Sequence, residues 1–103
     1  MFVKTKYFKF KVLANIPSAP IISRMVIPSL FVIGQPIVAQ VICETYVPLT
    51  YQWYKNNVSL GPSYNKSRLS ISSLASSHAG TYFCIVKNNK GRTVRSTSFT
   101  VKF

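Results

Sequence analysis

Residues 69–84 have the sequence LSISSLASSHAGTYFC, which carries the clearest fold signal in the chain. Leu69 and Ile71 share one parity, Tyr82 and Cys84 share another, and the turn-forming run SSHAG lies between the two pairs. Apolar residues at every second position are typical of strands that bury one face, and Ser, His and Gly in a cluster favour a turn. The stretch therefore predicts two short strands separated by a turn.

The same alternation continues on both sides of this stretch. Working outward, the positions of shared parity are Ile37, Ala39, Val41 and Cys43, then Tyr51 and Trp53, and near the end Phe99, Val101 and Phe103. Turn-forming residues fall between these runs at 55–57, 60–63 and 88–91. Several short strands with frequent turns favour an antiparallel sandwich or barrel, because each half-apolar sheet must bury one face on another.

The composition disfavours catalysis. The chain has 103 residues, and its 13 lysines and arginines face a single acidic residue, Glu44, so that its formal net charge is +12. General acid–base chemistry usually needs two titratable groups tuned apart, and hard divalent metals need several carboxylate oxygens. Ser77 and His78 could suggest a catalytic pair, but Glu44 is the only acid that could orient the imidazole. We expect a binding protein with no cofactor and no metal.

The two cysteines have two main interpretations. Cys43 and Cys84 both lie on inward parities, and Trp53 follows the first cysteine by ten residues. A disulfide between them would cross the core beside the indole, close a loop of about 41 residues and stabilise the fold by roughly 4 kcal/mol. Two buried free thiols are the alternative. A zinc site is less favoured, because one pair of cysteines and one distant histidine lack four clustered ligands.

These residues together resemble the immunoglobulin superfamily, most closely its intermediate-set (I-set) domains. The Cys43, Trp53, Cys84 pattern is similar to the family's disulfide and tryptophan, and residues 69–84 resemble its strand E and E–F corner motif, L-x-I-x-x-L-x-x-x-D-x-G-x-Y-x-C. The core signature that matches comprises Trp53, Leu69, Ile71, Leu74, Gly80 and Tyr82. His78 stands where the family usually has aspartate. Residues 86–91 resemble the family's A-x-N-x-x-G strand F and hairpin.

The resemblance implies an all-β, two-sheet antiparallel Greek-key sandwich. It implies a Cys43–Cys84 disulfide packed over Trp53, and a Tyr82 hydroxyl bonded to upstream backbone. The separation of the two cysteines leaves little room for additional C′ and C″ strands, which favours an I-set or constant-like domain over a variable one.

The resemblance covers about residues 17–103 and leaves the N-terminus to be explained. FKFKV at 8–12 has the same apolar and polar order as FTVKF at 99–103, an offset of about one domain length. We therefore divide the chain into residues 1–13, the last strand of a preceding domain or a basic N-terminal tail, a linker at 14–19, and an immunoglobulin-like domain at 20–103. Neither a membrane span nor a signal peptide is expected, because charged and helix-breaking residues interrupt every apolar run.

Three further features suggest sites. Asn57-Val-Ser and Asn65-Lys-Ser are N-glycosylation acceptor patterns in predicted loops, where the asparagines could equally serve as turn formers. A candidate anion- or partner-binding edge around the predicted F–G hairpin comprises Lys87, Lys90, Arg92 and Arg95. Such an edge could bind sulfated glycan, acidic protein or phospholipid headgroups, or could be a solvated hairpin that discourages edge-to-edge pairing. Nucleic acid is disfavoured as a partner, since no RRM, OB or zinc signature accompanies the charge.

The function that the resemblance implies is binding. Family members of this kind bind other proteins, often other immunoglobulin domains, as repeated modules of extracellular or cell-surface adhesion, receptor and matrix proteins. One alternative is a spacer in a cytoplasmic, sarcomeric array that resembles titin or twitchin. Another is a basic domain that binds glycosaminoglycan. An intact disulfide and glycan at Asn57 or Asn65 would support the extracellular interpretation, and reduced thiols without glycan would support the sarcomeric one.

Overall fold

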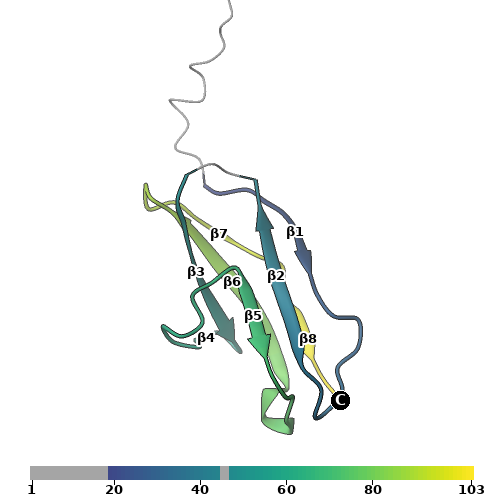
Figure 1. The fold of residues 1–103 in the computed structure, drawn as a ribbon. Coiled ribbons are helices and arrows are strands. Elements are labelled where there is room, and N and C mark those ends of the chain that lie inside the picture. The colour runs from purple at the N-terminus through teal and green to yellow at the C-terminus, as the bar shows by residue number, and fades with distance from the viewer. Residues whose placement is uncertain (1–18, 45–46) are drawn as a thin grey trace, which may run out of the picture.

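The computed structural model describes residues 19–44 and 47–103, and within them the chain forms short strands with a single 3-10 turn (Figure 1). The elements are β1 (Ile22–Val26), β2 (Ile37–Cys43), β3 (Leu49–Lys55), β4 (Val58–Ser59), β5 (Arg68–Ile71), η1 (Ser76–His78), β6 (Gly80–Asn88), β7 (Thr93–Arg95) and β8 (Phe99–Val101). No helix of the described residues is long and apolar enough to cross a membrane.

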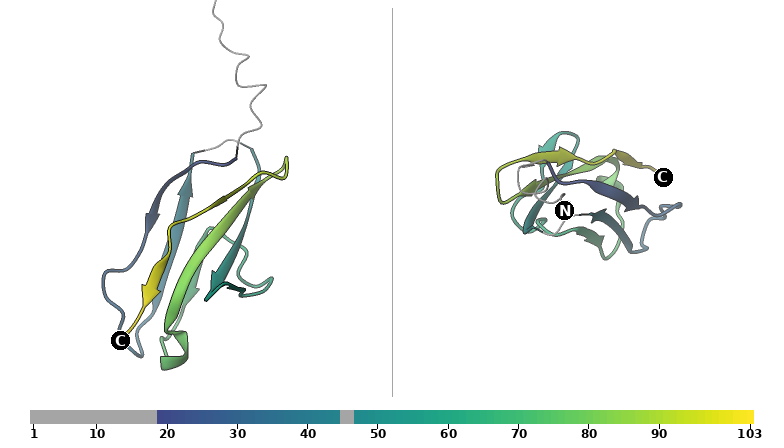
Figure 2. Two further views of the ribbon diagram at one scale, coloured as in Figure 1. Left: turned by 180° about the vertical axis from the view of Figure 1, so that it is seen from behind. Right: turned by 90° about the horizontal axis from the view of Figure 1, so that it is seen from above.

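The strands form two antiparallel sheets that face each other (Figures 1 and 2). One sheet has the order β1-β2-β5, and the other has the order β4-β3-β6-β7, with β8 also paired to β6. The chain passes from the first sheet to the second between β2 and β3, returns to the first between β4 and β5, and passes to the second again between β5 and β6, through η1. The predicted all-β, two-sheet sandwich is therefore confirmed.

The core lies between the sheets and is built from the predicted inward positions. Trp53 and Cys84 are fully buried where β3 and β6 pair, and Ala39 faces them from β2. The other buried apolar side chains of the core are Ile37, Val41, Leu69, Leu74, Tyr82, Val86, Phe99 and Val101. Phe103, which shares the parity of Phe99 and Val101, is 52% exposed, because β8 ends at Val101 and no longer holds the chain against the core.

Between β3 and β5 the described chain forms only the two-residue strand β4, which pairs with β3 at the edge of the sheet. A tight turn joins β3 to β4, and its central residues Asn56 and Asn57 have φ angles of 51° and 68°. Two central residues with positive φ define the type I′ turn, whose twist matches that of paired strands, and asparagine tolerates this conformation better than most residues.

β7 and β8 run along the same edge of β6 but differ in register by one residue, which marks a β-bulge between them. Ser96 sits at the bulge and is 6% exposed. Its N–H donates to the Cys84 carbonyl at 2.8 Å, and its hydroxyl oxygen accepts the Cys84 N–H at 2.8 Å. The serine side chain thus replaces the backbone partner that the shift in register removes from the centre of β6.

The predicted N-terminal strand or tail at residues 1–13 lies outside the described residues, as does the predicted linker except for Ala19.

Candidate functional site

The predicted E–F corner is the turn through η1 that joins β5 to β6, and hydrogen bonds around His78 hold it. The Tyr82 hydroxyl, on a side chain that is 2% exposed, donates to the His78 carbonyl at 2.6 Å. The His78 Nδ1 atom accepts the Ala75 N–H at 2.8 Å, and the Lys55 ammonium donates to the Ser77 carbonyl. The histidine that stands where the resembled family has aspartate therefore supplies a ring-nitrogen acceptor to the turn.

Gly80 allows β6 to begin close to the β3–β4 turn. Its φ is +155°, and a Cβ built on it would lie 2.9 Å from Lys55 Cε and 3.0 Å from Asn56 Nδ2. Asn56 bonds to Thr81 twice, because its N–H donates to the Thr81 carbonyl at 2.8 Å and its Oδ1 accepts the Thr81 N–H at 3.0 Å. A side chain at position 80 would force these groups apart.

The two cysteines are unbonded thiols in this structure. Cys84 is fully buried on β6 opposite Trp53, and Cys43 is half-buried at the end of β2. Burial raises the pKa of the Cys84 thiol to about 12, and burial also raises the pKa of Cys43. The predicted disulfide stays a prediction. Trp53 itself is anchored by its indole N–H, which donates to the Lys66 carbonyl at 2.8 Å.

The predicted F–G hairpin is the one that joins β6 to β7. Its turn is shaped by Asn88, which is 8% exposed. Its Oδ1 accepts the N–H groups of Lys90 at 2.9 Å and Arg92 at 3.0 Å, and its backbone carbonyl accepts the Gly91 N–H at 3.1 Å. Gly91 has a φ of +84°, which fits a three-residue hairpin loop that ends in a left-handed residue. This turn holds the side chains of Lys90 and Arg92 in solvent at the hairpin tip.

The structure divides the predicted cationic edge into two groups. Lys90 and Arg92 lie in the hairpin turn, whereas Lys87 on β6 and Arg95 on β7 alternate with the buried side chains of their strands and so face outward from the five-stranded sheet. All four side chains are exposed. All four lie on or around the β6–β7 hairpin, but only Lys87 and Arg95 share a sheet face.

An aromatic and arginine stack covers the middle of this outer face. The Phe83 side chain points away from the core and is nevertheless only 5% exposed. The Tyr54 ring from β3 stacks on it with centroids 5.0 Å apart and an interplanar angle of 5°, and Arg95 Cζ from β7 lies 3.8 Å from its centroid. Ile85, half-buried, is the next outward residue on β6 and pairs with Arg95. We name Tyr54, Phe83, Ile85 and Arg95 the outer patch.

Sequence reasoning identified Arg95 but missed the other three members of the outer patch. A signal was present, because Phe83 and Ile85 occupy the outward parity of β6, where a solvated strand would carry polar residues.

The two asparagines of the predicted glycosylation patterns, Asn57 and Asn65, are exposed to solvent. Asn57 is the second residue of the type I′ turn, and Asn65 lies between two residues whose carbonyls accept hydrogen bonds from Trp53. Among the described residues, no group of three potential metal ligands is present.

Comparisons with known proteins agree with this architecture. The second Ig-C2 domain of human Fc-receptor like A superposes with a TM-score of 0.61 at 22% identity, over 82% of this chain and 94% of that one. The Sidekick-1 immunoglobulin domains 1–4 give a TM-score of 0.70 at 25% identity, over 84% of this chain and 23% of that one. Extracellular domains 3–5 of Drosophila OTK give 0.68 at 16% identity, over 84% of this chain and 36% of that one.

The chain therefore spans about a quarter of the Sidekick-1 structure and about a third of the OTK structure that it matches. A comparison with curated proteins gave no match. The narrower assignment to the I-set stays a prediction. The immunoglobulin domain family model matches residues 19–102, and the chain belongs to that family.

Proposed function

We propose that this domain is a non-catalytic interaction module of an extracellular or cell-surface adhesion, receptor or matrix protein, and that it binds another protein through the outer patch. Membership of the immunoglobulin family and the likeness to immunoglobulin domains of Sidekick-1 support a protein-binding role. The likeness to extracellular domains of OTK is consistent with a role outside the cell.

The observation that carries the proposal is the stack of Tyr54, Phe83 and Arg95 on the outward side of the sheet. Tyrosine and arginine are among the residues most enriched at binding hot spots, because each combines a large contact area with a polar group. Here the packing against Phe83 holds both side chains in place before any partner arrives. Binding then costs less side-chain entropy than it would for freely rotating groups.

Charge indicates the kind of protein surface that fits. Arg95 belongs to the outer patch and Lys87 lies on the same face, in a chain whose only acidic residue, Glu44, follows β2 in the opposite sheet. Opposite charges across an interface speed association and exclude wrong partners. A partner with an apolar centre and acidic residues around it would therefore match the outer patch.

A paired substitution tests the proposal. The domain, displayed in multivalent form, is screened against a panel of purified extracellular proteins, and each binder is measured again with Ile85→Glu and Val38→Glu. Val38 is the matched control, since it is 44% exposed and on the outward parity of β2 in the opposite sheet. We expect Ile85→Glu to weaken binding at least about tenfold and Val38→Glu to leave it unchanged. Equal affinities for the two variants would contradict the proposal.

Binding of sulfated glycan is a second candidate, favoured by the exposure of Lys90 and Arg92 together at the hairpin tip. Heparin retention should fall steeply with salt, because exposed charges are screened over about 10 Å at 0.1 M salt. The double substitution Lys90→Glu and Arg92→Glu should lower retention further. Elution of this variant at the same salt concentration as the wild type would remove the hairpin tip as a glycan site.

A further inference from the structure

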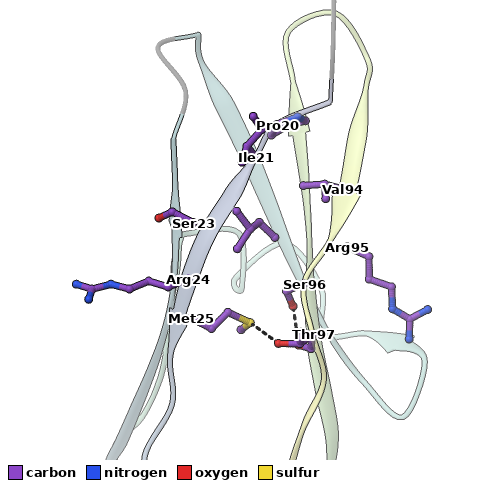
Figure 3. Close-up of a pocket in the computed structure, with 10 residues that line it drawn as sticks. Pro20, Ile21, Ser23, Arg24, Met25, Val94, Arg95, Ser96 and Thr97 are labelled. Carbon is purple, nitrogen blue, oxygen red and sulfur yellow. Dashed lines mark hydrogen bonds between the residues drawn. The ribbon is translucent and has the colours of Figure 1, made fainter.

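A groove of about 540 Å³ lies between β1 and β7, where the edges of the two sheets meet (Figure 3). Its floor is apolar and consists of Ile22 and Met25 from β1 and Val94 from β7, all of them half-buried side chains that pack against the core. The Thr97 hydroxyl donates to Met25 Sδ at 3.5 Å and joins the two walls at one end. The groove is therefore apolar along its length and is bridged by side chains at this end.

One wall of the groove is a strand edge with unused backbone groups. β7 pairs with β6 on one side, and no strand of the described chain pairs with its other side. The Ser96 N–H donates to the Cys84 carbonyl and the Asn88 N–H donates to the Arg92 carbonyl, so hydrogen-bonded pairs recur at every second residue of this ladder, with Val94 opposite Val86 between them. The N–H and C=O groups of Thr93 and Arg95 consequently point away from β6.

The charge around the groove is positive. Figure 3 shows the Arg24 and Arg95 side chains extending from the two walls on opposite sides of the groove. None of the described residues that line the groove is acidic. Glu44 lies beside one end, where its N–H donates to the Ile21 carbonyl at 2.8 Å, and its exposed side chain is not part of the lining.

We propose that the groove between β1 and β7 binds an extended peptide that alternates apolar and acidic residues and adds a strand to the free edge of β7. The backbone of the peptide takes up the unused N–H and C=O groups of Thr93 and Arg95, as in other cases of strand addition. Its apolar side chains rest on Ile22, Met25 and Val94. Its acidic side chains point outward, where directly opposed residues on neighbouring strands lie about 5 Å apart, next to the Arg95 guanidinium.

The probe is a fluorescein-labelled heptapeptide of alternating glutamate and valine, and the measurement is fluorescence anisotropy with the whole chain. A second heptapeptide with lysine in place of glutamate is the charge control. We expect the glutamate peptide to bind at least about tenfold more tightly than the lysine peptide, with an affinity that falls as salt rises. Equal binding of the two peptides overturns the proposal.

Backbone methylation separates strand addition from simple charge attraction. In an added strand, the N–H groups of alternate residues face β7, and the others face solvent. One peptide is therefore N-methylated on its glutamates and another on its valines. We expect one of them to lose binding and the other to keep it, and the identity of the losing peptide reports the direction of the added strand. Equal effects of the two methylations overturn the proposal.

Substitutions in the chain place the peptide in the groove. Thr93→Pro removes one free N–H without removing a bond to β6 and should weaken binding about tenfold. Arg24→Glu should weaken binding more than Arg68→Glu, which makes the same charge change on the far edge strand of the same sheet. If Thr93→Pro lowers the thermal midpoint, its effect on binding cannot be separated from a loss of folding. The two arginine variants and the methylated peptides then decide whether the peptide binds in the groove. Equal affinities of the two arginine variants, or a dimer that Thr93→Pro dissociates, overturn the proposal.

Discussion

The Tyr82 hydroxyl offers a sharp test of how the E–F corner is held. Tyr82→Phe removes one hydroxyl from a side chain that is 2% exposed and keeps the ring, which stacks on Phe99 at 5.5 Å, in place. The lost interaction is the 2.6 Å hydrogen bond to the His78 carbonyl. A typical net contribution is about 1 kcal/mol, and it rises toward about 2 kcal/mol because the acceptor is left without its donor in a half-buried turn.

Thermal and urea unfolding measure the effect. For a domain of this size each kcal/mol corresponds to about 4–8 °C in Tm, so we expect Tyr82→Phe to unfold about 4–16 °C lower with an unchanged urea slope. Tyr54→Phe is the matched control, because the Tyr54 ring stacks on Phe83 in the same way as a phenylalanine ring would. A Tyr82→Phe protein as stable as the Tyr54→Phe protein would show that the corner hydrogen bond contributes nothing.

Three other predictions follow from the described residues. Gly80→Ala should lower the free energy of unfolding by about 1–3 kcal/mol in urea titrations, since the new Cβ meets Lys55 and Asn56 at a positive φ, and an unchanged midpoint would contradict this. Burial raises the pKa of Cys84 to about 12, so the folded chain holds the thiol proton more tightly than the unfolded chain does. The free energy of unfolding of the reduced protein should therefore not depend on this thiol below about pH 9 and should fall as the pH rises toward 12. A Cys43–Cys84 disulfide would abolish this fall, and non-reducing mass analysis tells the reduced and disulfide forms apart. Secretion from a glycosylating cell should add glycan at Asn57 and Asn65, both exposed, and Asn57→Gln or Asn65→Gln should each remove the mass of one glycan; an unmodified mass would contradict the prediction.

Most of the fold could be predicted because it follows from local patterns. Period-2 alternation identifies which side chains of β2, β3 and β6 enter the core, and the spacing of Cys43, Trp53 and Cys84 identifies the two strands that carry its centre. These features depend on residues close in sequence or on a spacing that is specific to the family. Burial in the structure follows them closely, apart from Phe103, which is exposed, and Phe83, which is buried on the outward side of β6.

The outer patch and the groove could not be predicted in the same way, because both depend on pairing between distant strands. Phe83 is covered only because β3 and β7 bring Tyr54 and Arg95 to it from both sides. The groove depends on the register of β7 against β6, which the bulge at Ser96 changes. A sequence read one strand at a time gives parity, but it does not give the register between strands.

The outer patch and the groove give the excess of positive charge a more definite meaning. Arg95 takes part in both, because its guanidinium covers Phe83 while its backbone belongs to the free edge of β7. Four of the nine basic residues within the described ranges, Lys87, Lys90, Arg92 and Arg95, lie on the β6–β7 hairpin, next to this apolar surface. Tyr54→Ala removes part of the outer patch at β3, away from the groove lining. It should therefore lower the affinity for the protein partner and leave the affinity for the heptapeptide unchanged.

Whether the outer patch binds a partner is tested by the affinity of an identified extracellular protein for three forms of the domain. Surface plasmon resonance measures the affinity, and thermal unfolding checks that each form is folded. We expect the wild type and Val38→Glu to bind alike and Ile85→Glu to bind at least about tenfold more weakly. Binding that is lost equally in Val38→Glu and Ile85→Glu, or in neither, would contradict the claim that the outer patch is the binding surface.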